Sequence, residues 1–208
     1  QIAIAGKDPK KEAGAEEVTI EDKIRQWAPV AAVYLLWVAI FTVAQMLLSN
    51  TTEEKSNRVI EVLLSSVTPT ELMFGKLVGI AAIGLTMVGS WIASFMVMIH
   101  YGSGLESKIV KALIQVIATP ELLAAFAGYF LLGYLLYAGI FLAMGSVVNS
   151  LKEAQNLMGP IMLVMSIPLF TMVFIARDPN GTLAVVLSWV PLYTPFVMMN
   201  RAAASPPT

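Results

Sequence analysis

The sequence contains no cysteine and a single histidine, His100. Lack of cysteine excludes disulfides, thiol catalysis and thiolate metal sites, and one histidine cannot build a metal centre alone. Nucleotide-binding chemistry is also missing, because Gly75-Lys76 has neither the upstream glycine nor the following Ser or Thr of a Walker phosphate loop. No HExxH metalloprotease motif occurs either. We therefore predict a chain that is not an enzyme and holds no cofactor or metal of its own.

Charged residues are scarce, at 13% of 208 residues, whereas 57% are hydrophobic and the formal net charge is -1. This composition excludes a soluble globular protein and indicates an integral membrane protein. The nearly balanced charge gives no indication of a nucleic-acid partner. Four stretches carry no Asp, Glu, Lys or Arg and are each long enough to cross a bilayer as a helix, at 28–48, 77–99, 122–148 and 156–176. A membrane carrier driven by ions usually keeps a charge inside its spans, so energy for any transport is expected to enter from outside the bilayer.

The last apolar stretch, 183–199, is too short for a confident span and contains Pro191 and Pro195. Proline removes a backbone donor, and backbone left free inside a membrane survives only against protein or water. We predict that this stretch is a re-entrant hairpin of two half-helices near the outer face. Pro191, Tyr193 and Pro195 are its candidate gate residues.

The stretch 50–76 is a polar island between two apolar spans. Thr51 with Glu54, and Thr68 with Glu71, have the spacing of capping boxes, in which a hydroxyl and a carboxylate satisfy backbone N–H groups reciprocally. The pattern predicts an amphipathic helix over 53–66, a break, and a new helix that starts at Pro69 and continues into the second span. Ser150 with Glu153 predicts a third capping box.

Small and polar residues recur within the predicted spans. Seven glycines either allow close helix packing or are simply common residues of spans, at Gly79, Gly84, Gly89, Gly128, Gly133, Gly139 and Gly145. Polar span residues either line a path or form hydrogen bonds between helices, at Gln45, Thr86, Ser90, Ser94, Asn156, Ser166 and Thr171.

The polar island also carries a long sequence pattern. It consists of Glu53, Glu54, Lys55, Asn57, Arg58, Glu61, Leu63, Leu64, Ser66, Pro69, Leu72, Gly75 and Lys76. This pattern resembles the first cytoplasmic loop of ABC transporter permeases of the type 2 exporter family, in particular the sodium-efflux (NatB-like) branch. The segments 150–155 and 190–196 resemble later parts of the same permeases more weakly.

The resemblance implies how the chain is organised and what it binds. The helix over 53–66 would be a coupling helix that docks on a cytoplasmic ABC ATPase, while its apolar face stays against the permease. The residues expected to meet the ATPase are Glu53, Glu54, Lys55, Arg58 and Glu61. ATP and magnesium would lie on that ATPase, and a second permease half, identical or different, would complete the transporter. Residues 1–26 would be the end of a truncated extracytoplasmic domain, and 27–208 a fragment of the permease domain.

The predicted fold is an all-α polytopic transmembrane bundle in the plasma (inner) membrane of a prokaryote. Its predicted function is export of a small substrate, such as sodium or a drug, using ATP hydrolysed by a separate ATPase subunit. The alternative is a membrane scaffold or assembly subunit that transports nothing. In the predicted topology 53–76 and 149–155 face the cytoplasm, whereas 1–26, 101–120 and 177–180 face outward.

Overall fold

The computed structural model describes residues 20–57, 59–101 and 119–204. These residues form seven helices and no strand, which confirms the all-α fold class. The helices are α1 (Ile20–Ser56), α2 (Val59–Leu64), α3 (Pro69–Tyr101), α5 (Pro120–Val147), α6 (Leu151–Arg177), α7 (Thr182–Ser188) and α8 (Thr194–Ala204). Most of the predicted domain end at 1–26, and the candidate ATPase contact Arg58, lie outside the described residues.

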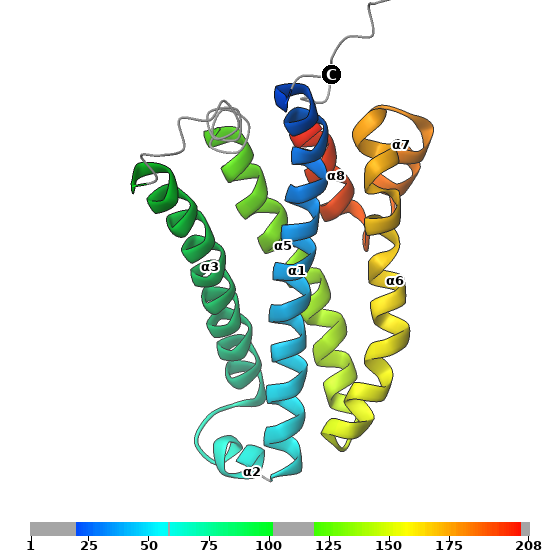
Figure 1. Cartoon of the computed structure of the whole chain (residues 1–208). Helices are drawn as coiled ribbons and strands as arrows, with labels where there is room; N and C mark the ends of the chain where they lie inside the picture. Colours follow the sequence, from blue (N-terminus) through cyan, green and yellow to red (C-terminus); the bar gives the residue numbers. More distant parts are fainter. Residues whose placement is uncertain (1–19, 58, 102–118, 205–208) are drawn as a thin grey trace, which may run out of the picture.

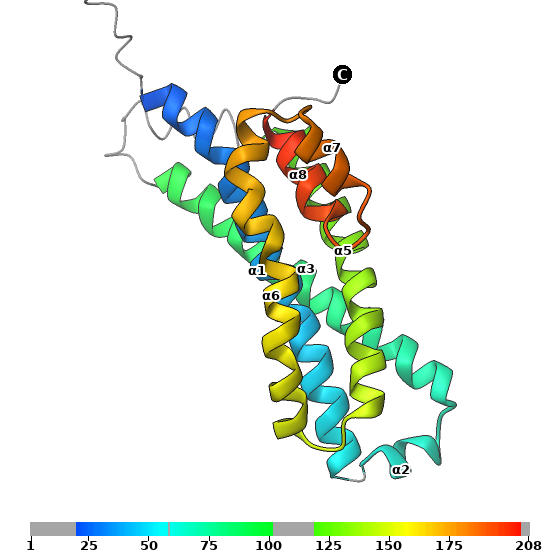
Figure 2. The same ribbon diagram turned by 90° about the vertical axis from the view of Figure 1, so that its right-hand side faces the viewer.

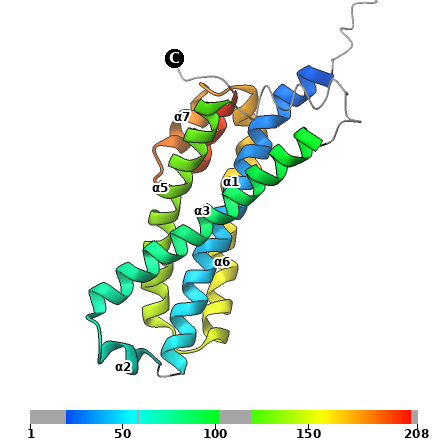
Figure 3. The same ribbon diagram turned by 90° about the vertical axis from the view of Figure 1, so that its left-hand side faces the viewer.

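Four of these helices are long and apolar enough to cross a membrane: Trp27–Ser56, Pro69–Ser94, Pro120–Val147 and Leu151–Arg177. They alternate in direction along the bundle (Figure 1). Helix α1 is the central one, because its residues Leu36, Ala39, Ile40, Ala44 and Leu47 are fully buried. Helices α5, α6 and α8 pack around it, while α3 crosses it on one side (Figure 3).

Helix α1 runs past the predicted end of its span at residue 48 and continues to Ser56. The predicted capping box of Thr51 with Glu54 is therefore wrong, because Thr51 lies inside the helix. Thr52 lies beside it and donates its hydroxyl to the Leu48 carbonyl oxygen at 2.9 Å, one turn back in the same helix. Thr51 and Thr52 are both buried, and Thr51 packs against Gly145 of α5. Tertiary packing thus overrides the preference of threonine for a helix start.

The predicted helix over 53–66 is divided in the structure. Residues up to Ser56 belong to α1, a turn follows at Asn57, and α2 covers only Val59–Leu64. The division follows from the continuation of α1. Residues 53–56, the first four of the predicted helix, form the last turn of α1. The short α2 that remains lies beside the end of α1 and leads from it to the start of α3 (Figure 2).

The other two predicted capping boxes are confirmed. The Glu71 carboxylate accepts from the Thr68 backbone N–H at 2.9 Å, and the Glu71 N–H donates back to the Thr68 hydroxyl at 3.3 Å. At the start of α6 the Glu153 N–H donates to the Ser150 hydroxyl, and the Glu153 carboxylate accepts from the Asn149 N–H. Both sites are exposed, so purely local hydrogen bonds set these two helix starts.

Three of the seven span glycines allow helices to approach closely. A Cβ atom on Gly84 of α3 would lie 2.5 Å from Phe130 Cζ and 2.9 Å from Val43 Cγ2, which places α3 against α1 and α5. A Cβ atom would lie 2.5 Å from its nearest neighbour at Gly133 and 3.2 Å from it at Gly145. Nothing lies within 4 Å of a Cβ atom at Gly79, Gly89, Gly128 and Gly139. Spacing along the sequence did not distinguish the two groups.

Helices α7 and α8 form a hairpin whose connection points back along the bundle, so that the start of α7 and the end of α8 lie at the same end (Figures 1 and 2). Pro191 lies in the connection between them, as predicted for a break. Pro195 does not break a helix, because it is in the first turn of α8, where a missing N–H leaves no hydrogen bond unmade.

Candidate functional site

The bundle has two ends with different local structures. The α2 end holds α2, the start of α3, and the turn from α5 to α6. The hairpin end holds α7, α8, the last residues of α3 and the first residues of α5 (Figure 1). All segments predicted to face the cytoplasm lie at the α2 end, and the described outward segments lie at the hairpin end. Which end faces the cytoplasm stays a prediction.

Helix α2 is exposed on its polar and its apolar side. Two acidic side chains are exposed here: Glu53 in the last turn of α1 and Glu61 on α2. Val62 is 71% exposed and Leu64 is 41% exposed. Leu64 belongs to the apolar face that was expected to pack against the permease, and the described residues leave it exposed. Helix α2 lies beside the end of α1, between it and the start of α3 (Figure 2).

Two of the five candidate ATPase contacts make interactions inside the chain instead. The Glu54 carboxylate forms an ion pair with Lys76 Nζ of α3 at 2.5 Å, and the side chain of Lys76 is only 10% exposed. Lys55 Nζ donates to the carbonyl oxygens of Ser146 at 2.8 Å and Val148 at 3.0 Å. These carbonyls lie at the C-terminal end of α5, where carbonyl groups lack helical partners and attract a cation.

The hairpin is held from within the bundle. Tyr137 of α5 donates its hydroxyl to the Leu192 carbonyl oxygen at 2.6 Å, in the connection between α7 and α8. The Thr194 hydroxyl lies 2.8 Å from the Ser188 carbonyl oxygen and 2.9 Å from that of Val190. The carbonyls exposed by the break at Pro191 therefore find donors, as polar backbone inside a bilayer requires. Of the candidate gate residues, Pro191 is exposed, Tyr193 is half-buried and Pro195 is buried.

Further contacts tie the hairpin to α6. Asn200 of α8 is 1% exposed and donates its amide to the Met172 carbonyl oxygen at 2.8 Å. Arg201 donates to the Asn180 side-chain oxygen at 3.0 Å. Each bond joins α8 to α6 or to the turn that follows it. The hairpin is thus fixed at its tip by α5 and at its outer end by α6.

Four of the seven polar span residues named from the sequence form hydrogen bonds within their own helix and not between helices. Thr86, Ser90, Ser166 and Thr171 each donate to a carbonyl one turn back in their own helix. The links between helices come instead from the Trp37 indole to the Met165 carbonyl oxygen, and from the Tyr134 hydroxyl to that of Leu77. The signal for these was present, because a Trp or Tyr inside an apolar span needs a partner for its polar atom.

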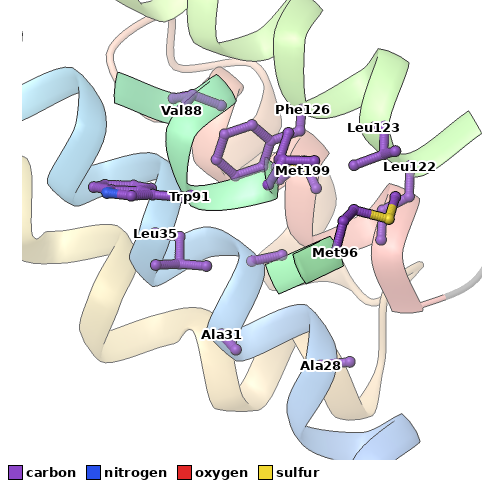
Figure 4. A pocket seen from close by; sticks show the side chains of 12 residues that line it. Ala28, Ala31, Leu35, Val88, Trp91, Met96, Leu122, Leu123, Phe126 and Met199 are labelled. Carbon is purple, nitrogen blue, oxygen red and sulfur yellow. The ribbon is translucent and has the colours of Figure 1, made fainter. Parts of the chain in front are cut away.

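A cavity of about 290 Å³ lies between α1, α3 and α5 (Figure 4). Its walls are apolar side chains, including Leu35, Trp91, Met96, Phe126 and Met199. The described side chains that line this cavity offer no oxygen ligand to a cation.

The four long apolar helices indicate a multi-pass helical membrane protein. It has the short exposed helix α2 at one end and the helical hairpin of α7 and α8 at the other. Residues 5–207 match the family described as ABC-2 family transporter protein. The chain therefore belongs to the ABC-2 family of transporter proteins, whose members are membrane-embedded transport subunits.

Two curated relatives are similar to most of this chain, and in each the similar region is less than half of the relative's own length. The chain is 32% identical over 185 residues to the uncharacterized protein MJ1024 of Methanocaldococcus jannaschii, covering 89% of this chain and 43% of that protein. It is 31% identical over 172 residues to the uncharacterized protein YhaP of Bacillus subtilis, covering 81% of this chain and 41% of that protein. The chain thus spans about two fifths of the length of these relatives. No solved structure matches it.

Proposed function

We propose that this chain is part of the membrane-spanning permease of an ATP-binding-cassette exporter, driven by a separate cytoplasmic ATPase. The observation that carries the proposal is helix α2, whose Glu61, Val62 and Leu64 side chains are exposed, in a chain of the ABC-2 family. ATP and magnesium belong to the ATPase in this proposal. The other partners are a second permease half and the lipid bilayer.

The physical argument for a partner at α2 concerns its length and its exposure. A helix of six residues is far below the roughly 12–15 residues that an isolated helix needs in water. Of its four described side chains, Glu61, Val62 and Leu64 are exposed and Leu63 is half-buried. A groove on another protein would cover the apolar residues and pair with the acidic ones, as in the recognition of amphipathic helices generally.

The proposal also covers the position of the gate, the substrate and the membrane in which the chain lies. The hairpin closes the end of the bundle opposite α2, so we propose that it lies beside the outer exit of the path, with Pro191, Tyr193 and Pro195 at the gate. The pattern over 53–76 resembles that of the sodium-efflux branch, which makes sodium the first substrate to test. Relatives from an archaeon and a bacterium support a prokaryotic plasma membrane as its location.

The test is to reverse an exposed charge at the α2 end and to compare it with the same change at the other end. In the complete permease, Glu61→Lys is expected to lower retention of the ATPase during purification and to lower sodium efflux from vesicles. Glu121→Lys is the matched control, because Glu121 is exposed at the start of α5, at the hairpin end.

Both variants are expected to insert normally, since exposed substitutions change stability by less than about 0.5 kcal/mol. A Glu61→Lys permease that retains its ATPase as well as the Glu121→Lys permease would contradict docking at α2. A permease that never associates with an ATPase would favour the scaffold alternative.

A further inference from the structure

We propose that Glu54, Lys55 and Lys76 form an inner brace, defined as these three side chains with the carbonyls of Ser146 and Val148. The brace joins the ends of α1, α3 and α5 so that a displacement of α2 moves all three helices together. The inference rests on the proposed function and divides the five candidate ATPase contacts into two groups. Glu53 and Glu61 face the partner, while Glu54 and Lys55 are positioning residues inside the permease.

The first half of the brace closes the loop that carries α2. Glu54 lies in the last turn of α1 and Lys76 lies in the second turn of α3, so their ion pair spans the base of the α2 segment. The paired atoms, Glu54 Oε2 and Lys76 Nζ, are buried, and neither has another hydrogen-bond partner among the described residues. Removal of the Glu54 charge would leave the Lys76 ammonium, 10% exposed, without its partner, which is costly in a protein interior, whereas the Glu54 side chain is 28% exposed.

The second half of the brace joins α1 to α5. The last turn of α5 contains no basic residue of its own, and Lys55 supplies the cation from the neighbouring helix. The two helices also approach closely one turn earlier, where a Cβ atom on Gly145 would lie 3.2 Å from Thr51 Cγ2. Lys55 therefore caps α5 and holds its end at a fixed distance from α1.

The geometry has a mechanical consequence. A force on α2 reaches α1 through the turn at Asn57 and α3 through the turn at Thr68. The ion pair of the brace makes these two helix ends move as one, and Lys55 passes the displacement to the end of α5, which holds the hairpin through Tyr137. The brace thus connects the α2 end with the hairpin by contacts that are all within this chain.

The test measures motion at the hairpin end and does not require the substrate to be known. Spin labels are placed on cysteines at Glu121 and Arg177, two exposed residues at the hairpin end, in the complete permease, freed of other cysteines and bound to its ATPase. The distance between the labels is measured with and without ATP. In Glu54→Lys and in Lys76→Glu, we expect the ATPase to stay bound and to hydrolyse ATP, while the ATP-dependent change in the ratio of the distance populations falls about tenfold, within the range of coupling between sites.

The charge exchange Glu54→Lys with Lys76→Glu restores the opposite charges and is expected to restore the distance change. If the single variants fail to fold, the exchange variant still decides, because a brace predicts recovery of both folding and motion. For Lys55, the arginine variant should keep the motion and the methionine variant should lose it. Single variants that move like the unmodified permease, or an exchange variant that folds without recovery, overturn the brace.

The same measurements distinguish the brace from the proposed function. Absence of any ATP-dependent change in the unmodified complex, or full ATPase retention by Glu61→Lys, counts against the proposed function. Loss of ATPase binding in Glu54→Lys to the extent seen in Glu61→Lys shows that Glu54 is a partner contact, which overturns the division of the two groups.

Discussion

Helix α2 and the α7–α8 hairpin are both short, interrupted segments between or beside the spans, yet they differ in what holds them. In the hairpin Phe196 of α8 is buried and the backbone at the break is bonded to Tyr137, although Trp189 at the end of α7 is 83% exposed. In α2, Val62 and Leu64 are exposed. The hairpin is therefore anchored in the bundle through α8 and the break, whereas three of the four described side chains of α2 are exposed.

The difference agrees with the roles proposed for the two ends. A gate beside a path has to keep its position, and α8 gives it an anchor because Phe196 and Met199 belong to the core of the bundle. A segment that receives motion from another subunit needs a free surface and a firm base. Glu54, Lys55 and Lys76 supply that base, and the comparison can be tested by matched changes at the two ends.

The largest effect is expected from blocking the seat of the hairpin. A side chain at Gly133 of α5 would collide with Ile40 Cδ1, at 2.5 Å from the added Cβ, and with Pro195 Cβ, at 3.2 Å. We expect Gly133→Leu to lower the free energy of unfolding by about 3 kcal/mol, since overpacking forces neighbours to shift. Thermal unfolding in detergent measures the change. Gly139→Leu on the same helix is the control, because nothing lies within 4 Å of its Cβ; equal destabilisation by both variants would contradict close packing of the hairpin on α5.

A smaller effect is expected from one polar substitution made at both ends. Val197 in the hairpin is 1% exposed and Val62 on α2 is 71% exposed. Val197→Ser is expected to destabilise by about 2 kcal/mol, from lost packing and a buried hydroxyl, whereas Val62→Ser should stay within about 0.5 kcal/mol. Val62→Ser should instead weaken ATPase retention. A large loss of stability from Val62→Ser in the isolated permease would show that α2 packs on its own chain.

The smallest effect concerns the cap at the base of the α2 segment. Thr68→Ala removes the hydroxyl that accepts from the Glu71 N–H, and we expect a loss of about 1 kcal/mol, as for other helix caps. Hydrogen exchange of the first turn of α3 reports the fraying directly. Thr119→Ala is the control, because Thr119 precedes α5 without a side-chain cap bond. Faster exchange at both helix starts would mean that threonine acts there through something other than the cap.

Several features of the fold could be predicted because they depend on neighbours in the sequence. A run of about 20 residues without charge is sufficient for a span, and four such runs became α1, α3, α5 and α6. The starts at Pro69 and Leu151 followed from Thr68 and Ser150, whose hydrogen bonds join residues three apart. The break at Pro191 followed from its missing donor.

The candidate sites depended on contacts that sequence spacing does not contain. Thr51 has the spacing of a helix start, but its burial against Gly145 keeps it inside α1. Glu54 and Lys55 look like neighbours of Glu53 in one charged surface, yet successive residues on a helix point in different directions and meet different helices. Gly133 and Gly139 are alike in the sequence, and only the positions of Ile40 and Pro195 in the packed bundle separate them.

The sequence by itself thus determined the membrane class, the number of long spans and the local helix starts, because hydrophobic burial in lipid and capping act within a segment. Tertiary structure alone decided which charges pair inside the chain, which glycines are crowded and which apolar residues stay uncovered. Those properties depend on distances between segments far apart in the chain, such as Lys55 and Val148 or Tyr137 and Leu192, which are set only when the helices pack.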